Sequence, residues 1–191
     1  MIGALPKTLD IDGVRLDIRT DYRNILQILI AFNDEDLTWN ERYEVMIRRL
    51  YINHEVINSS NYETAVRKAV EFIDAGITSG GGNSVDHRLY DWEQDEQIIF
   101  SAINKVAGRE VRSDAYMHWW TFLGMFYEIG EGVFSTVVSI RDKQCKGKKL
   151  EKYEQDFYRN NKNMVKLKKK YSEKEEAELN RLRALLGIKN G

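Results

Sequence analysis

The chain has 191 residues, of which 42% are hydrophobic and 31% charged, and its formal net charge at pH 7 is −1. This composition supports one large domain and excludes a disulfide-stapled miniprotein, because Cys145 is the single cysteine. No stretch reaches the about 18 apolar residues of a membrane span, and the N-terminus does not resemble a secretory signal. We therefore expect a soluble protein of a reducing cytoplasm.

The small net charge conceals an uneven distribution along the chain. Residues 143–170 hold eleven basic and three acidic side chains, a net of +8, and residues 171–191 hold four of each. The 14 basic and 23 acidic side chains of residues 1–142 give −9. Two interpretations of the lysine-rich segment are open. It could be a solvated helix, or it could contact an acidic surface, including that of a second copy.

The first two-fifths of the chain predict a β-hairpin followed by helices. Residues 8–18 alternate apolar and polar side chains around Asp12-Gly13, a pair that supplies the positive φ values of a two-residue turn. Apolar residues at helical spacing follow, and they predict three helices. The expected helix caps are Thr20, Thr38 and Asn61.

Residues 79–84, Ser-Gly-Gly-Gly-Asn-Ser, are the clearest break in the chain. Three consecutive glycines favour neither helix nor strand, so we expect a flexible loop. A phosphate-binding loop would need a Gly-Lys-Ser/Thr sequence after the glycines and a clear strand before them. Neither is present, so the interpretation as a linker is favoured.

Residues 114–128 predict a central, buried helix. They contain two of the four tryptophans, and at 3.6 residues per turn their aromatic side chains fall nearly all round the helix. Flanking helices are expected over about 92–107 and 134–141. The core residues that we predict are Trp92, Tyr116, Trp119, Trp120 and Phe126.

Chemistry-bearing residues are sparse. His118 lies four residues after Asp114, a spacing that could orient an imidazole for general-base catalysis. No second base, nucleophile or metal-ligand pair stands nearby in sequence, so a histidine at the edge of a packed helix is favoured. Cys145 among lysines is interpreted as a surface thiol. We therefore predict no catalytic residues, no metal and no cofactor, and hence not an enzyme.

The C-terminal quarter predicts helices with thin apolar stripes, which are marginally stable alone. We predict a mainly α fold: a helical body over residues 1–149 with a small N-terminal β-hairpin, and extended C-terminal helices. Residues 150–191 would form a basic helical arm with a terminal amphipathic helix, docking its stripe on a partner. The candidate partner-binding residues are Tyr153, Phe157, Leu179, Leu182 and Leu186.

Three short motifs resemble a known family. They are Tyr90-Asp-Trp-Glu-Gln-Asp95, the block His118-Trp-Trp120 and the pair Ile140-Arg141. In this order and at these spacings they resemble the bacteriophage gene product fifteen family, found in long-tailed phages and prophages of Gram-positive bacteria. The opening Leu5-Pro6 and Thr20-Asp-Tyr-Arg23 resemble it as well, so the likeness extends to about residue 149.

The resemblance implies a role without a catalytic site. Family genes usually lie between those of the major tail protein and the tape-measure protein, and members are regarded as tail assembly chaperones. The implied partner is the tape-measure protein, which the chaperone keeps soluble during tail assembly. Further implied partners are other copies of the chain and the tail-tube protein, all in the host bacterial cytoplasm, with no membrane involved.

Two other functions stay open at this point. The lysine-rich segment could neutralise the phosphates of a nucleic acid, although lysine outnumbers arginine there by ten to one and the acidic body would repel phosphate. The protein could instead be a virion structural component of the tail or connector. Its presence in purified particles would distinguish that role from a chaperone.

Overall fold

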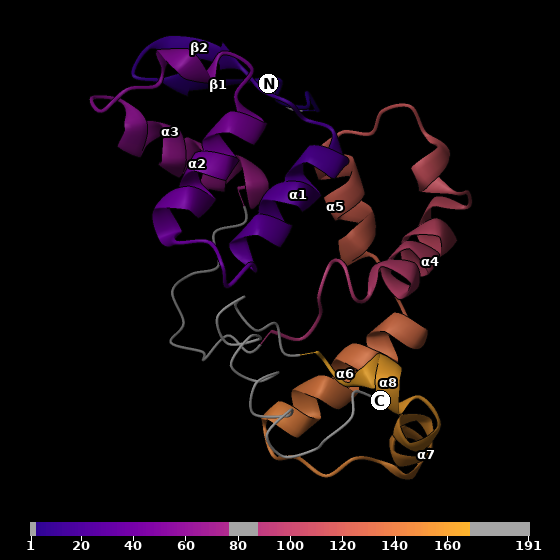
Figure 1. Ribbon diagram of the computed structural model, residues 1–191. Coiled ribbons are helices and arrows are strands. Elements are labelled where there is room, and N and C mark those ends of the chain that lie inside the picture. The colour runs from indigo at the N-terminus through magenta and orange to yellow at the C-terminus, as the bar shows by residue number, and fades with distance from the viewer. Residues whose placement is uncertain (1–2, 77–87, 169–191) are drawn as a thin grey trace.

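The computed structural model describes residues 3–76 and 88–168 (Figure 1). The glycine-rich segment 79–84 and the partner candidates Leu179, Leu182 and Leu186 lie outside these residues.

The described residues form one antiparallel hairpin followed by eight α-helices, which confirms the mainly α fold with a small N-terminal hairpin. The strands are β1 (Thr8–Ile11) and β2 (Val14–Asp17). The helices are α1 (Tyr22–Phe32), α2 (Trp39–Leu50), α3 (Tyr62–Ile73), α4 (Glu96–Ala107), α5 (Trp119–Tyr127), α6 (Val133–Cys145), α7 (Lys152–Asn160) and α8 (Lys162–Val165). The hairpin and α1–α3 form one end of the molecule, α6–α8 form the other, and α4 and α5 lie between them (Figure 1).

The hairpin forms as its sequence predicts. Asp12 and Gly13 have φ values of 52° and 86°, the two positive values that a tight hairpin turn needs. Ile11 pairs with Val14 across this turn. Ile11 and Leu16 are buried, so the inward face of the hairpin joins the core.

The predicted caps of α2 and α3 differ in outcome. Thr38 accepts from the backbone N–H of Glu41, whose carboxylate accepts from the Thr38 N–H at 2.8 Å, so the predicted cap of α2 is confirmed as a capping box. Asn61 precedes α3 as predicted, but its side-chain oxygen accepts from the N–H of Asn58 and makes no helix cap.

The cap of α1 is Asp21, one residue after the predicted Thr20. The carboxylate of Asp21 accepts from the backbone N–H of Arg23 at 3.0 Å. Thr20 is held elsewhere: its hydroxyl bonds to the Tyr116 hydroxyl at 2.7 Å, and its carbonyl accepts from the N–H of Trp119. A long-range contact therefore decides which of two adjacent capping residues is used.

The aromatic helix α5 is shorter than the predicted span of 114–128. It begins at Trp119 because the preceding residues are extended and pair with the start of α1, through an antiparallel bridge between Asp21 and His118. Tyr116 lies in this extended segment with 53% of its surface exposed. The prediction that Tyr116 belongs to the core is therefore wrong.

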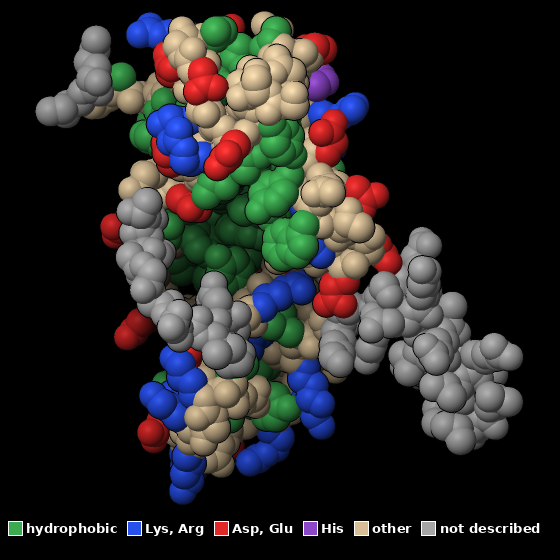
Figure 2. All heavy atoms as spheres, turned by 90° about the vertical axis from the view of Figure 1, so that its left-hand side faces the viewer, with side chains coloured by type: hydrophobic (Ala, Val, Ile, Leu, Met, Phe, Trp, Pro, Cys, Tyr) green, Lys and Arg blue, Asp and Glu red, His purple; other side chains and the backbone are tan. Residues whose placement is uncertain are grey.

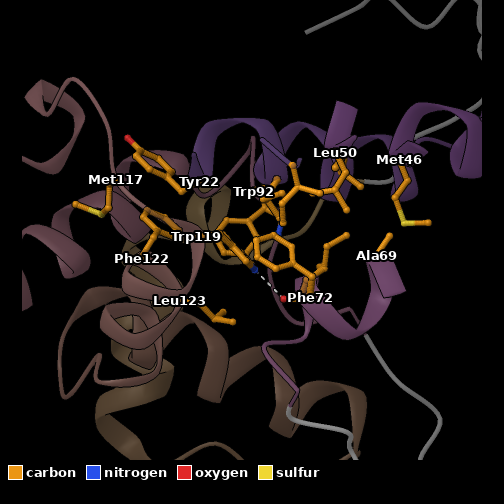
Figure 3. Packing of buried hydrophobic residues seen from close by; sticks show 14 of the residues in the cluster. Tyr22, Met46, Leu50, Ala69, Phe72, Trp92, Met117, Trp119, Phe122 and Leu123 are labelled. Carbon is orange, nitrogen blue, oxygen red and sulfur yellow. Dashed lines mark hydrogen bonds between the residues drawn. The ribbon is translucent and has the colours of Figure 1, made fainter. Parts of the chain in front are cut away.

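The other four predicted core aromatics do pack in the core. Trp119 and Trp92 are buried, while Trp120 and Phe126 are partly buried and packed against the main cluster. Trp119 lies among side chains from α1, α2 and α3 (Figure 3). Tyr127 is exposed, so α5 has a solvent side that its sequence did not predict.

The lysine-rich segment packs more firmly than its sequence predicts. A basic helical arm was expected from residue 150, and no break was predicted in its first part, but the chain breaks at Asn161 into α7 and the short α8. Val165 is fully buried in a second cluster with Val137 and Ile140 of α6. Residues 150–168 are thus docked on α6, and the expectation of a loosely held arm is wrong for them.

The burial of the two neighbouring tryptophans gives a stability prediction. Trp119→Ala should lower the free energy of unfolding by about 3–5 kcal/mol, because it removes a fully buried aromatic side chain. Trp120→Ala should cost clearly less, since that side chain is only partly buried. Urea unfolding followed by circular dichroism measures both, and equal losses would contradict the central place of Trp119.

Candidate partner-binding surfaces

His118 is a structural helix cap. Its Nδ1 accepts from the backbone N–H of Trp120 at 3.0 Å, and its Nε2 lies 2.9 Å from the carbonyl oxygen of Pro6. Since a carbonyl only accepts, the proton of the neutral ring is on Nε2, which donates to Pro6. Asp114 does not orient this ring but pairs with Arg109 at 2.7 Å. The favoured interpretation of a packed histidine agrees with this geometry.

The two tryptophans after His118 hold the end of α3. The indole N–H of Trp119 donates to the carbonyl of Ile73 at 2.7 Å, and that of Trp120 donates to the carbonyl of Phe72 at 2.8 Å. The last carbonyls of a helix lack the usual partner four residues on, and the indole of Trp119 supplies one for Ile73. The indole of Trp120 adds a second bond to the Phe72 carbonyl, which also accepts from the N–H of Ala75. The His-Trp-Trp block thereby ties α5 to α3 and to the N-terminal segment.

Arg141 and Asp95 form a buried ion pair at the other end of the core. Their side chains are at most 4% exposed and meet through two bonds of 2.5 and 3.0 Å. The guanidinium also donates to three backbone carbonyls, those of Leu89, Met164 and Val165. One side chain of α6 therefore fixes the start of α4, the segment before it and the end of α8.

The acidic motif before α4 builds the other half of this site. Asp91 accepts from the backbone N–H groups of Glu93 and Gln94, and its own N–H donates to Asp95 at 2.9 Å. These turns replace the first turn of the predicted helix, so α4 begins at Glu96 instead of residue 92. The motif acidic residues thus position the carboxylate that receives Arg141.

The described residues contain neither a metal-binding cluster nor a membrane-spanning helix. Over 3–76 and 88–168, no group of three or more histidine, cysteine, aspartate and glutamate side chains could hold a metal ion. In the same part of the chain, no helix is long and apolar enough to cross a membrane.

The two described partner candidates differ in exposure. Tyr153 of α7 has 65% of its surface exposed. Phe157 is partly buried and packs against the second cluster, so it anchors α7 on α6. Of these two, only Tyr153 presents most of its side chain to a partner.

A partly exposed aromatic surface lies on α1 and α2, and sequence reasoning missed it. We call Phe32, Trp39 and Tyr43 the Trp39 cluster; their ring centroids are 5.6 to 6.5 Å apart. Trp39 is 63% exposed, and the guanidinium of Arg42 lies 4.8 Å from its ring centroid. The available signal was the helical spacing of Trp39 and Tyr43 with the buried Met46, which extends the apolar stripe of α2.

A pocket adjoins this cluster. It has a volume of about 410 Å³ and shares Phe32 with the Trp39 cluster. Its other apolar walls are Leu29, Leu89, Tyr90 and Trp92. On the side of the molecule drawn in Figure 2, hydrophobic side chains gather in a hollow near mid-height. Contiguous exposed apolar surface of this kind is typical of an interaction site.

The charge asymmetry of the sequence is also an asymmetry in space. Lysine and arginine side chains gather at the α6–α8 end, whereas acidic side chains are scattered over the rest (Figure 2). Part of this basic charge is used internally, since Lys143 bonds both carboxylate oxygens of the buried Glu154 at 2.7 and 2.8 Å. The hydrogen bond from Lys143 is the main cause that lowers the pKa of Glu154 below its ordinary value.

The family comparison explains why these motifs are present. Residues 1–172 match the family model described as Bacteriophage Gp15 protein. The chain belongs to this family. The resemblance drawn from the three motifs is thus confirmed, and the Gp15 chain is a phage structural or assembly protein. Searches of curated proteins and of solved structures found no match.

Breaking the buried ion pair should lower the stability of the fold far more than breaking the pair between Asp142 and Lys146. Asp95→Ala should lower the free energy of unfolding by about 3–5 kcal/mol, because it leaves the Arg141 charge buried without its partner. Arg141→Lys keeps the charge but has too few donors for the carbonyls. As a control, Asp142→Ala removes a partly exposed pair on the same helix and should cost about 1 kcal/mol or less. Chemical denaturation compares the three, and a small loss for Asp95→Ala would refute the anchoring role.

We expect Glu154 to make the free energy of unfolding depend on pH in the acid range. Its pKa in the folded protein is lowered from 4.5, so its stabilising effect is present above that value and is lost as the pH falls through the folded pKa. Stability of a Glu154→Gln variant should therefore fall less steeply with acid than that of the parent below about pH 4.5. Urea midpoints at several pH values test this, with Glu35→Gln, at an exposed position away from α7, as the control.

Proposed function

We propose that this Gp15 family member is a tail assembly chaperone that binds the tape-measure protein and keeps it soluble. The observation that carries the proposal is the Trp39 cluster, an exposed aromatic surface on a phage assembly protein. Large aromatic side chains supply most of the energy at many protein interfaces. An amphipathic helix of the client would lay its apolar face on such a surface.

The surroundings of the cluster suit a reversible contact. The neighbouring pocket gives a client side chain a place to insert, and Arg88 on its wall and Arg42 beside Trp39 are basic. The apolar area is small, so each contact would be weak, and many copies along one client would be needed. Weak contacts repeated along a filament can be displaced one by one by tail-tube subunits.

We further propose that the chaperone acts as a homo-oligomer in the host bacterial cytoplasm. The basic α6–α8 end and the acidic remainder could meet in neighbouring copies. Contacts between unlike surfaces run head to tail, and they give an open spiral when the rotation does not close. A spiral of this kind would match the extended helical shape of a tape measure.

Co-expression with the tape-measure protein tests the chaperone proposal. Trp39→Ser should lower the soluble fraction of the client several-fold, whereas the chaperone itself should stay folded because Trp39 is mostly exposed. Tyr127→Ser, at a 59% exposed aromatic on α5, is the matched control and should leave the client soluble. If the client is equally soluble without the chaperone, this function is wrong. If the client is as soluble with Trp39→Ser as with Tyr127→Ser, the Trp39 cluster does not bind it.

A further inference from the structure

A second apolar depression runs along α4, on elements separate from the Trp39 cluster. It consists of two contiguous hollows of about 690 and 740 Å³ that share Ile98 and Met164. The α4 side chains that line it are led by Ile98, Ala102 and Val106, and Phe134 forms part of the opposite wall. Val106 and Met164 remain over a third exposed. We call this the α4 groove.

The described chain ends at one mouth of the α4 groove. Lys166 and Lys168 line that mouth, and they are held there by Gln94, whose side-chain amide bonds the Lys166 carbonyl and the Lys168 N–H at 2.8 Å. Residues 169–191 continue from this point. A linker of three residues, 169–171, reaches about 10 Å, which is enough to enter the groove.

The spacing of the leucines in the continuing segment matches the spacing of the apolar side chains that line the α4 groove. Residues 172–186 predict an amphipathic helix with Leu179, Leu182 and Leu186 on one face. These leucines would span about 10 Å, and Ile98 to Val106 span about 12 Å at 1.5 Å per residue. Side chains at spacings of three and four on one helix interlock with a spacing of four on the other.

The charges of the continuing segment and of the α4 groove are complementary when the segment runs parallel to α4. The segment begins with four glutamates between residues 173 and 178 and continues with Arg181 and Arg183. The near mouth of the groove carries Lys166 and Lys168, and the far end carries Glu128 and Glu131. Lys105 also lies at the far end, where it donates to the Glu131 carbonyl. A helix parallel to α4 would therefore place opposite charges together at both ends.

We propose that residues 172–186 dock in the α4 groove of their own chain, with the three leucines facing α4. The short linker gives the segment a millimolar effective concentration at its own groove, which favours this occupant over a second copy. The docked segment covers apolar surface that would otherwise promote association. This inference concerns the chain alone and does not depend on the client.

Disulfide trapping in the full-length chain tests the docking. In a Cys145→Ser background, which removes the natural thiol, Val106→Cys is combined with Leu186→Cys. Mild oxidation should give a disulfide within one chain, seen as a faster-migrating monomer in a non-reducing gel. The control pairs Val106→Cys with Ala184→Cys, on the opposite helix face, and should cross-link at least about tenfold more slowly because its Cβ atoms point apart.

A second measurement does not need the cross-link. The thiol of Val106→Cys alone, in the Cys145→Ser background, should react several-fold faster with a charged thiol reagent when Leu179, Leu182 and Leu186 are replaced by serine. Disulfide-linked dimers would show that a second copy fills the groove and would overturn the proposal. Equal trapping of both cysteine pairs, or unchanged thiol reactivity, would overturn it as well. None of these outcomes bears on the co-expression test at Trp39.

Discussion

The C-terminal half of the fold depends on the buried guanidinium of Arg141. It has five N–H donors, and the five bonds to Asp95, Leu89, Met164 and Val165 use all of them. A buried charge is costly unless it is paired and hydrogen-bonded, and here both conditions hold. Because its partners come from separate segments, the side chain is satisfied only when α4, α6 and α8 are assembled together. Only a residue with a planar fork of donors can do this, and lysine cannot.

The His-Trp-Trp block likewise joins separate segments in the N-terminal half of the fold. His118 reaches the Pro6 carbonyl, and the two indoles reach the last carbonyls of α3. Both motifs therefore use side-chain donors to bond backbone carbonyls at helix ends and in loops, several of which have no other backbone partner. The residues that identify the family maintain the frame of the protein. Their hydrogen bonds account in structural terms for the most distinctive features of the sequence.

Local signals in the sequence were sufficient where no distant contact competes. The Asp12-Gly13 turn and the Thr38 capping box are set by neighbouring residues, and both were predictable. Tyr116 was misplaced because strand-like pairing with the start of α1 overrides the helical pattern before Trp119. The break at Asn161 was missed for a similar reason, since burial of α8 against α6 has no local signature. The Trp39 cluster was missed because helical periodicity shows which face of α2 is apolar, but it does not show which part of that face lies beyond the core.

The side chains around the Trp39 cluster disfavour self-association of the protein through this surface. Trp39 is flanked by Arg42 on its ring face and by the acidic loop of residues 34–36 just before α2. A cation over an indole is favourable and keeps water and charge beside an otherwise apolar surface. The carboxylates of this loop repel those of the same loop in a second copy, while contact with a neutral amphipathic helix stays open. In the proposed chaperone, a small aromatic surface inside a charged surround would combine affinity for a client with resistance to aggregation.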